Sequence, residues 1–485
     1  MEDKKKKLEH LNGHKLITRR HFLAQGLISG AAYVFTPSIL SLLAKSAHAQ
    51  DCGAAAGMLA GKTPVIIIDL GGGANFAGSN VMVGGAGGQK DFLDTYQTLG
   101  LTSNLHPDNA GQLNEEMGLA FHADSGILRG IKSVASPNTL AGVDGGIFCA
   151  VSDDDTGNNP HNPAYWLNLA GSQGELAQLV GNRNNVTGGN STAPAASIDA
   201  SRFPVNISSP NDAIGLVTAG KLSEIFPNQA KVQKVLDTVR KMSESRITAF
   251  SQQTLPNQIR ELVKCGYIQA SDFLNRYSAN QLSPAQDPLI TQVFTNLNDG
   301  NQRSAASITK LVLDGYAGVG TIEKGGNDYH TGNRSVGETR DFEAGQLIGR
   351  VLEVAARKNK DLVMYILTDG GVAANGGVDD SQAGRGKLSW TTENGDRSST
   401  FMLVYKAGGG RVSIRNAGRQ VGHFRANGSV ETSSSLVGNS VTNLSKAIVA
   451  NYLALHGQEG QLSSIIGDNP FGSDLNRYLI FNRLR

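Results

Sequence analysis

Short apolar runs that end in glycine or acidic residues are the most regular pattern in the chain. They cover Val65–Leu70, Gly146–Val151, Leu362–Leu367 and Thr400–Tyr405, with a weaker run at Ala317–Ile322. A short run that is apolar throughout and rich in β-branched residues is typical of a strand buried on both faces. The pattern therefore predicts a series of buried strands, most of them parallel.

Between these runs, apolar residues recur every three or four positions, as they do on one face of an amphipathic helix. The spacing is clearest at 341–358 and 441–455, and it extends over much of 213–314. Residues 183–212 are instead rich in Asn, Gly, Ser, Thr and Pro, so we expect a loop and helical insertion around 183–300. Buried strands that alternate with amphipathic helices predict the α/β class, as a three-layer sandwich with a mainly parallel sheet.

The N-terminal segment has the organisation of an export signal. Thr18-Arg19-Arg20-His21-Phe22-Leu23 follows a basic head, and it leads into the apolar run Leu23–Leu43 and the small-residue cleavage site Ala47-His48-Ala49. That order is typical of a bacterial twin-arginine signal, whose machinery translocates chains that have already folded. A membrane anchor is the alternative because the run is nearly long enough to span a bilayer, but Pro37 and the Ala-x-Ala end argue against it. We therefore expect a periplasmic or secreted protein.

Removing residues 1–49 as the signal changes the sign of the net charge. The signal holds 8 of the 44 Lys and Arg and 3 of the 42 Asp and Glu, which leaves 36 basic against 39 acidic residues, a charge of about −3. No nucleic-acid partner is therefore expected. Residues 50–62 are interpreted as a linker and 63–485 as one α/β domain. The cysteines are too few for a disulfide framework, although an oxidising compartment would allow Cys149 to pair with Cys265.

Side chains able to bind a metal follow three of the predicted strands, namely Asp69, Asp328, His330 and Asp369. Because the carboxyl ends of parallel strands meet at one edge of a sheet, we expect these residues on one rim. Carboxylate and imidazole ligands suit one divalent cation, which could be zinc, manganese, magnesium or calcium. The alternative is that the acids cap turns and helix starts. Gly71-Gly72-Gly73 lacks the spacing of a dinucleotide-binding loop, so no nucleotide cofactor is expected.

Five motifs occur in order along the chain: Gly71–Asn75, His161–Trp166, Gly326–His330, Thr368–Gly371 and Gln382–Gly386. They resemble motifs of the twin-arginine-exported family called domain of unknown function 1501, and the similarity covers most of 63–456. That family is similar to the alkaline phosphatase and sulfatase superfamily. The resemblance implies an alkaline phosphatase-like fold with Asp69 as a metal ligand at the end of the first strand. It also implies a metal-dependent hydrolase of phosphate or sulfate esters.

The motifs depart from the family at positions where the resemblance implies catalytic or metal-binding side chains. Pro160 stands where the family has a serine, and Gln382-Ala383 stands where it has Asp-His. Gly370 follows Asp369 where alkaline phosphatases carry a histidine. A hydrolase with two metal ions needs about six ligands and a nucleophile, so the implied site is degraded.

Two functions remain open from the sequence. One is a metal-dependent hydrolase of a small ester with a degraded active site, or a pseudoenzyme derived from it. The other is a non-catalytic periplasmic or cell-envelope protein that binds a glycan or a protein partner, or has a structural role. Position alone adds more distant candidates, which are His161 and His423 as ligands and Ser79 and Thr156 as nucleophiles.

Overall fold

The computed structural model describes residues 62–153, 159–216, 234, 238, 279–330 and 334–485. All of these except 234 and 238 belong to one compact unit. The expected export signal, the helical pattern at 239–278 and Cys265 lie outside the described residues. Among those that are described, no helix combines the length and apolar character needed to cross a membrane.

An eight-stranded sheet forms the centre of the unit. Only β11 runs antiparallel to the other strands, so the sheet is mostly parallel. The predicted fold class, a three-layer α/β sandwich with a mainly parallel sheet, is confirmed. In spatial order the strands are β12 (Gln420–Val421), β4 (Val143–Cys149), β11 (Ser399–Tyr405), β8 (Leu362–Thr368), β1 (Val65–Leu70), β7 (Ala317–Lys324), β5 (Ala177–Gly181) and β6 (Val205–Asn206).

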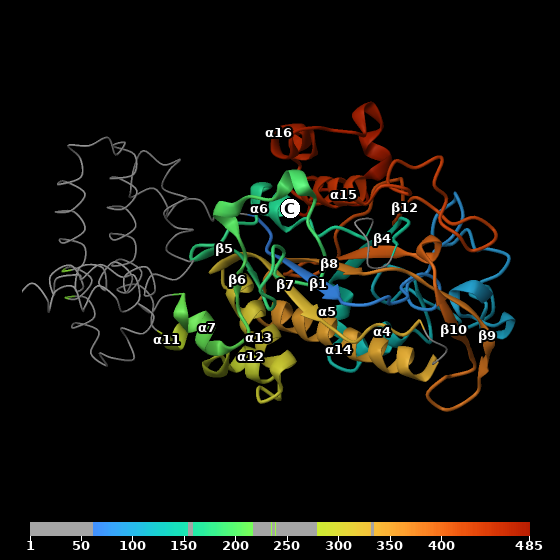
Figure 1. Cartoon of the computed structure of the whole chain (residues 1–485), viewed down its shortest axis with the longest axis horizontal. Coiled ribbons are helices and arrows are strands. Elements are labelled where there is room, and N and C mark those ends of the chain that lie inside the picture. Colours follow the sequence, from blue (N-terminus) through green and yellow to red (C-terminus); the bar gives the residue numbers. More distant parts are fainter. Residues whose placement is uncertain (1–61, 154–158, 217–233, 235–237, 239–278, 331–333) are drawn as a thin grey trace, which may run out of the picture. The chain divides into compact units, whose positions relative to one another are not determined.

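Helices cover both faces of this sheet (Figure 1). Because side chains alternate along a strand, Val65 and Ile67 of β1 face one helical layer and Ile66 faces the other. The first layer contains α6 (Ala164–Leu169), α15 (Val441–Ala454) and α16 (Leu462–Ile466). The second contains α4 (Gly126–Lys132), α5 (Pro137–Ala141), α13 (Gly300–Leu313) and α14 (Arg334–Arg357).

Glycines allow α4 and α14 to approach each other closely. A Cβ on Gly130 would lie 2.1 Å from the backbone oxygen of Phe342, and one on Gly345 would lie 2.1 Å from that of Ile127. Real carbon atoms do not come so near, so neither position accepts a side chain without moving a helix. This contact fixes α14, whose first turns lie beside the candidate site.

The hairpin formed by β9 (Val372–Asp379) and β10 (Lys387–Glu393) was not predicted from the sequence, and α14 begins at Arg334 rather than at 341. The described parts of 183–300 contain short elements, among them α7 (Pro210–Gly215), α11 (Ala279–Leu282) and α12 (Pro288–Thr291). The remaining short elements are η2 (Gln97–Leu99), η3 (Ser103–Leu105), β2 (Leu113–Asn114), β3 (Phe121–His122), η4 (Ala195–Ser197), η5 (Ala200–Arg202), η6 (Pro284–Gln286), η7 (Gly395–Arg397), η8 (Glu459–Gln461) and η9 (Gly472–Tyr478).

Candidate functional site

The carboxyl ends of β1, β7 and β8 lie side by side at one edge of the sheet. Leu70 at the end of β1 pairs with Thr368 of β8 and with Lys324 of β7, both in parallel register. Asp69 and Asp369 therefore lie on the same edge, which confirms their predicted shared position. The loop after β7, which carries Asp328 and His330, begins at this edge as well.

Asp69 is buried and its carboxylate is already bound by the protein. Its Oδ2 accepts hydrogen bonds from the backbone N of Asn190 at 2.7 Å, the backbone N of Ser191 at 2.8 Å and the hydroxyl of Ser191 at 2.7 Å. A carboxylate oxygen has about two lone-pair sites, so three donors leave this oxygen no room for a cation. The side chain is only 1% exposed.

Burial raises the pKa of Asp69, because the charged form is removed from water. The hydrogen bonds from Ser191 and Asn190 act in the opposite direction, and the nearby charge of Glu323 raises the pKa further. Glu323 is itself buried and pairs with Arg183 at 2.8 Å. The inner part of the rim is thus a set of acids whose partners come from the protein itself.

Asp369 is bound in a similar way. Its Oδ1 accepts a hydrogen bond from the amide of Asn159, and its Oδ2 accepts one from the amide of Asn190 at 3.2 Å. Asn190 therefore joins both acids, through its backbone to Asp69 and through its side chain to Asp369. Both oxygens of Asp369 are thus bound by side-chain amides of the protein.

The loop after β7 lies against the glycine turn that follows β1. Gly72 has a φ of 104°, and a Cβ there would lie 2.4 Å from the backbone N of Asp328, so only glycine allows this approach. Exposure alternates along the loop, since the Tyr329 side chain is buried while those of Asp328 and His330 are 61% and 26% exposed. The two ligand-type side chains thus project away from the core.

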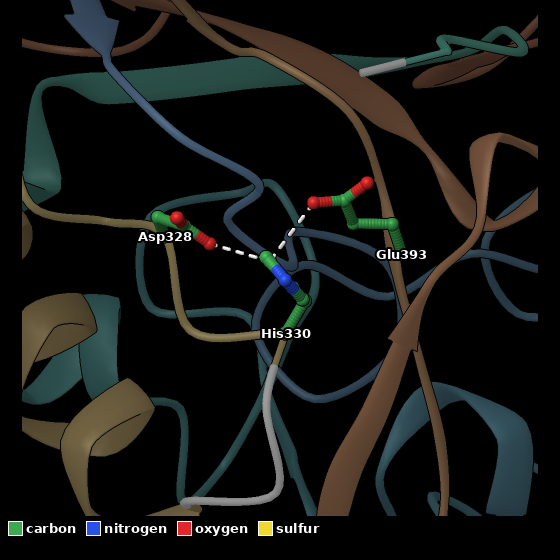
Figure 2. A group of neighbouring side chains, drawn as sticks. All are labelled: Asp328, His330 and Glu393. Carbon is green, nitrogen blue, oxygen red and sulfur yellow. Dashed lines mark ion pairs between the residues drawn. The ribbon is translucent and has the colours of Figure 1, made fainter. Parts of the chain in front are cut away.

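Asp328 and His330 converge with a third residue, Glu393 at the end of β10 (Figure 2). His330 Nδ1 lies 2.5 Å from Asp328 Oδ1 and 3.0 Å from Glu393 Oε1. All three ligand atoms lie within 4.8 Å of one another. Nδ1 is buried and forms no hydrogen bond, although it is within ion-pair distance of both carboxylates.

This donor set suits a divalent cation. Ligand atoms of a tetrahedral site with bonds of about 2.0 Å lie roughly 3.3 Å apart, and the two separations from His330 Nδ1, 2.5 and 3.0 Å, are shorter than this. Two carboxylates and one imidazole match the preferences of zinc or manganese. Three protein ligands would leave at least one coordination position open to water.

The structure brings together two of the four sequence-predicted ligands, Asp328 and His330, with Glu393 in place of Asp69 and Asp369. Sequence reasoning missed Glu393 because the β9–β10 hairpin was not recognised. The available signal was the turn sequence Asn394-Gly395 directly after it, which marks the end of a strand.

Among the described residues, the more distant candidates are not part of this cluster. His161 contributes its backbone oxygen to the hydroxyl of Ser445, and His423 contributes its backbone oxygen to an amide. The hydroxyl of Ser79 is buried and donates to Asn75 at 2.8 Å. The segment Gln382–Gly386 lies in the turn between β9 and β10, opposite the end of the hairpin that carries Glu393. Cys149 is a buried free thiol, and Thr156 lies outside the described residues.

Comparison with known proteins gives no relative: no family model, no curated protein and no solved structure matches this chain.

Proposed function

We propose that this is an exported, non-catalytic protein of the cell envelope that binds one divalent cation at the rim formed by Asp328, His330 and Glu393. The observation that carries the proposal is the approach of His330 Nδ1 to two carboxylate oxygens without hydrogen-bond geometry. A cation between the three atoms would replace the ion pairs that His330 forms with Asp328 and Glu393. When bound, such a cation would polarise a ligand or a water molecule at its open position.

Hydrolysis of esters is not part of the proposal. The acids that would complete a two-metal site, Asp69 and Asp369, accept hydrogen bonds from the protein instead. The hydroxyl of Ser79, one candidate nucleophile, is buried and bonded to an asparagine. The resemblance to the alkaline phosphatase superfamily would then extend to the fold and not to a retained reaction.

Calorimetric titration of the mature protein with Mn²⁺ tests this function. We expect one site per chain in the wild type, with binding weakened at least tenfold in His330→Ala. His106→Ala is the matched control, because this partly buried histidine lies in a different loop and bonds the backbone of Leu93. Aryl phosphate and aryl sulfate should not turn over measurably with Mn²⁺ present. Metal-dependent turnover, or equal binding by wild type and His330→Ala, would contradict the proposal.

A second candidate function is the binding of a neutral polar ligand such as a glycan. A cleft of about 570 Å³ lies between the β9–β10 hairpin and the loop at 97–105. Its lining combines amide and hydroxyl side chains with apolar surface, as a sugar ring requires, and it also contains the charged residues Asp380 and Arg385 but no aromatic residue. Titration with soluble glycan fragments tests this function, with Asn104→Ala expected to weaken any binding observed.

A further inference from the structure

Tyr329 ties the ligand loop to the core. Its hydroxyl donates to Asp341 Oδ1 at 2.7 Å and accepts from the backbone N of Asn75 at 2.6 Å. The ring is only 2% exposed, and it lies between the two exposed ligand-type residues of the loop. One buried hydroxyl thus connects this loop both to helix α14 and to the turn after β1.

The acceptor of that bond is itself held firmly. Asp341 Oδ2 accepts from the amide of Asn80 at 2.8 Å, and Asn80 Oδ1 accepts from the hydroxyl of Ser125 at 2.8 Å and from Ile127 N at 3.1 Å. Ser125 in turn caps the first turn of α4. Tyr329 is therefore anchored to a chain of hydrogen bonds that reaches the glycine-lined contact between α4 and α14.

The strand that supplies the third ligand packs on the same tyrosine. The ring of Trp390 in β10 lies 6.2 Å from that of Tyr329, and the guanidinium of Arg334 lies 4.3 Å from the Trp390 ring. Arg334 is fully buried and pairs with Glu338 at 2.8 Å. Glu393 is three residues beyond Trp390 on β10. The loop with Asp328 and His330 and the strand with Glu393 are therefore both held by the buried contact between Tyr329 and Trp390.

We propose that Tyr329 and Asp341 are positioning residues that set the separation of Asp328, His330 and Glu393 before a cation binds. This inference rests on the proposed function, because it concerns the affinity of that same site. Without the hydroxyl of Tyr329, the loop keeps its packing against Trp390 but loses its hydrogen bonds to Asp341 and to Asn75. Cation binding then has to order the ligand atoms, and this entropic cost lowers the affinity.

Co²⁺ is the probe for the test, because its visible absorption reports coordination number and geometry as well as affinity. The mature protein is titrated as wild type, as Tyr329→Phe and as Asp341→Asn. We expect both variants to bind Co²⁺ about tenfold more weakly and with an altered visible spectrum. A tenfold loss of affinity is about the smallest effect typical of residues that support metal ligands.

Tyr96→Phe is the matched control. Its hydroxyl is equally buried, donates to the backbone oxygen of Val83 at 2.6 Å and accepts from Leu93 N at 3.4 Å. This variant loses comparable hydrogen bonds elsewhere, so its Co²⁺ affinity and spectrum should equal those of the wild type. Asp341→Asn provides the test if Tyr329→Phe does not fold.

The outcomes separate the two proposals. Wild-type protein that binds no Co²⁺, or that binds it as well as His330→Ala does, overturns the proposed function and this inference with it. Binding that depends on His330 but is unchanged in affinity and spectrum by Tyr329→Phe and Asp341→Asn overturns only the positioning role. An equal effect of Tyr96→Phe would likewise overturn it, because the loss would then be one of general stability.

Discussion

Two groups of acids lie on the same edge of the sheet and differ in what surrounds them. Asp69 and Asp369 accept hydrogen bonds from asparagine and serine groups of the protein. Asp328 and Glu393 instead converge on a histidine nitrogen that makes no hydrogen bond. Protein donors saturate one oxygen of Asp69 and bind both oxygens of Asp369, while the second group has ligand atoms directed at a shared point.

The difference teaches that a position at the end of a strand does not make an acid a metal ligand. An oxygen that already accepts its full number of hydrogen bonds gains little from a cation, because binding would first break those bonds. At Asp328 and Glu393, a cation would instead take the place of ion pairs with His330. Saturation by protein donors therefore separates Asp69 from the candidate ligands, although it shares their rim.

Removing Asp69 should give the largest loss of stability and leave cation binding intact. Asp69→Ala leaves three donors of Asn190 and Ser191 without their acceptor, and we expect the free energy of unfolding to fall by about 4 kcal/mol. Denaturant unfolding measures this loss, and Asp69→Asn, which keeps an acceptor oxygen, should lose less. If Asp69→Ala folds yet no longer binds Mn²⁺, Asp69 belongs with the ligands and the comparison fails.

Stability should depend on pH through Asp341. Burial raises its pKa from 3.8 to about 6, and the neighbouring charge of Glu338 adds to the rise. At pH values between the unfolded pKa of 3.8 and the folded pKa of about 6, the folded protein binds more protons than the unfolded chain. The stabilising contribution of Asp341 is therefore complete below about pH 4 and is lost as the pH rises through 6. The total change is about 3 kcal/mol.

Asp341→Asn isolates this effect, because the other titrating groups are common to both proteins. The stability of the wild type relative to the variant should fall as the pH rises from 4 to 7, as measured by urea unfolding at each pH. A difference that stays constant over this range would show that Asp341 does not change its protonation state on folding in the expected way.

Replacing Glu393 should weaken cation binding and leave the fold intact. Glu393 is 39% exposed and takes part in the three-residue cluster, so we expect Glu393→Ala to reduce Mn²⁺ affinity about tenfold, or about 1.4 kcal/mol. Asp369→Ala is the comparison from the other group of acids and should change the affinity less than twofold. The reverse ranking in calorimetric titration would assign the ligands as the sequence first indicated.

The smallest effect is expected in the turn between β9 and β10. Arg385 pairs there with Asp124 through contacts of 2.8 and 2.7 Å, but both side chains are partly exposed to solvent. Arg385→Ala should therefore lower the free energy of unfolding by less than about 1 kcal/mol. Mn²⁺ affinity should not change, and a clear loss would show that this turn contributes to the site.

The hydrophobic pattern predicted the elements that depend on local spacing. The runs at 65–70 and 362–367 became β1 and β8, and the periodic segment at 441–455 became α15. The β9–β10 hairpin was missed, because several of its side chains are exposed and its strands lack a continuous apolar run. Export by the twin-arginine route stays a prediction, since residues 1–49 lie outside the described part of the chain.

By itself the sequence determined that Asp69, Asp369 and the loop carrying Asp328 and His330 share one edge, because parallel strands necessarily end on the same side. Only the tertiary structure decided which of these acids are free to bind. The donors to Asp69 come from a segment 121 and 122 residues further along the chain, and that segment has no periodic pattern. Glu393 reaches His330 only because a hairpin returns to the rim. Hydrogen-bond saturation depends on distances between segments remote in sequence, which no local pattern encodes.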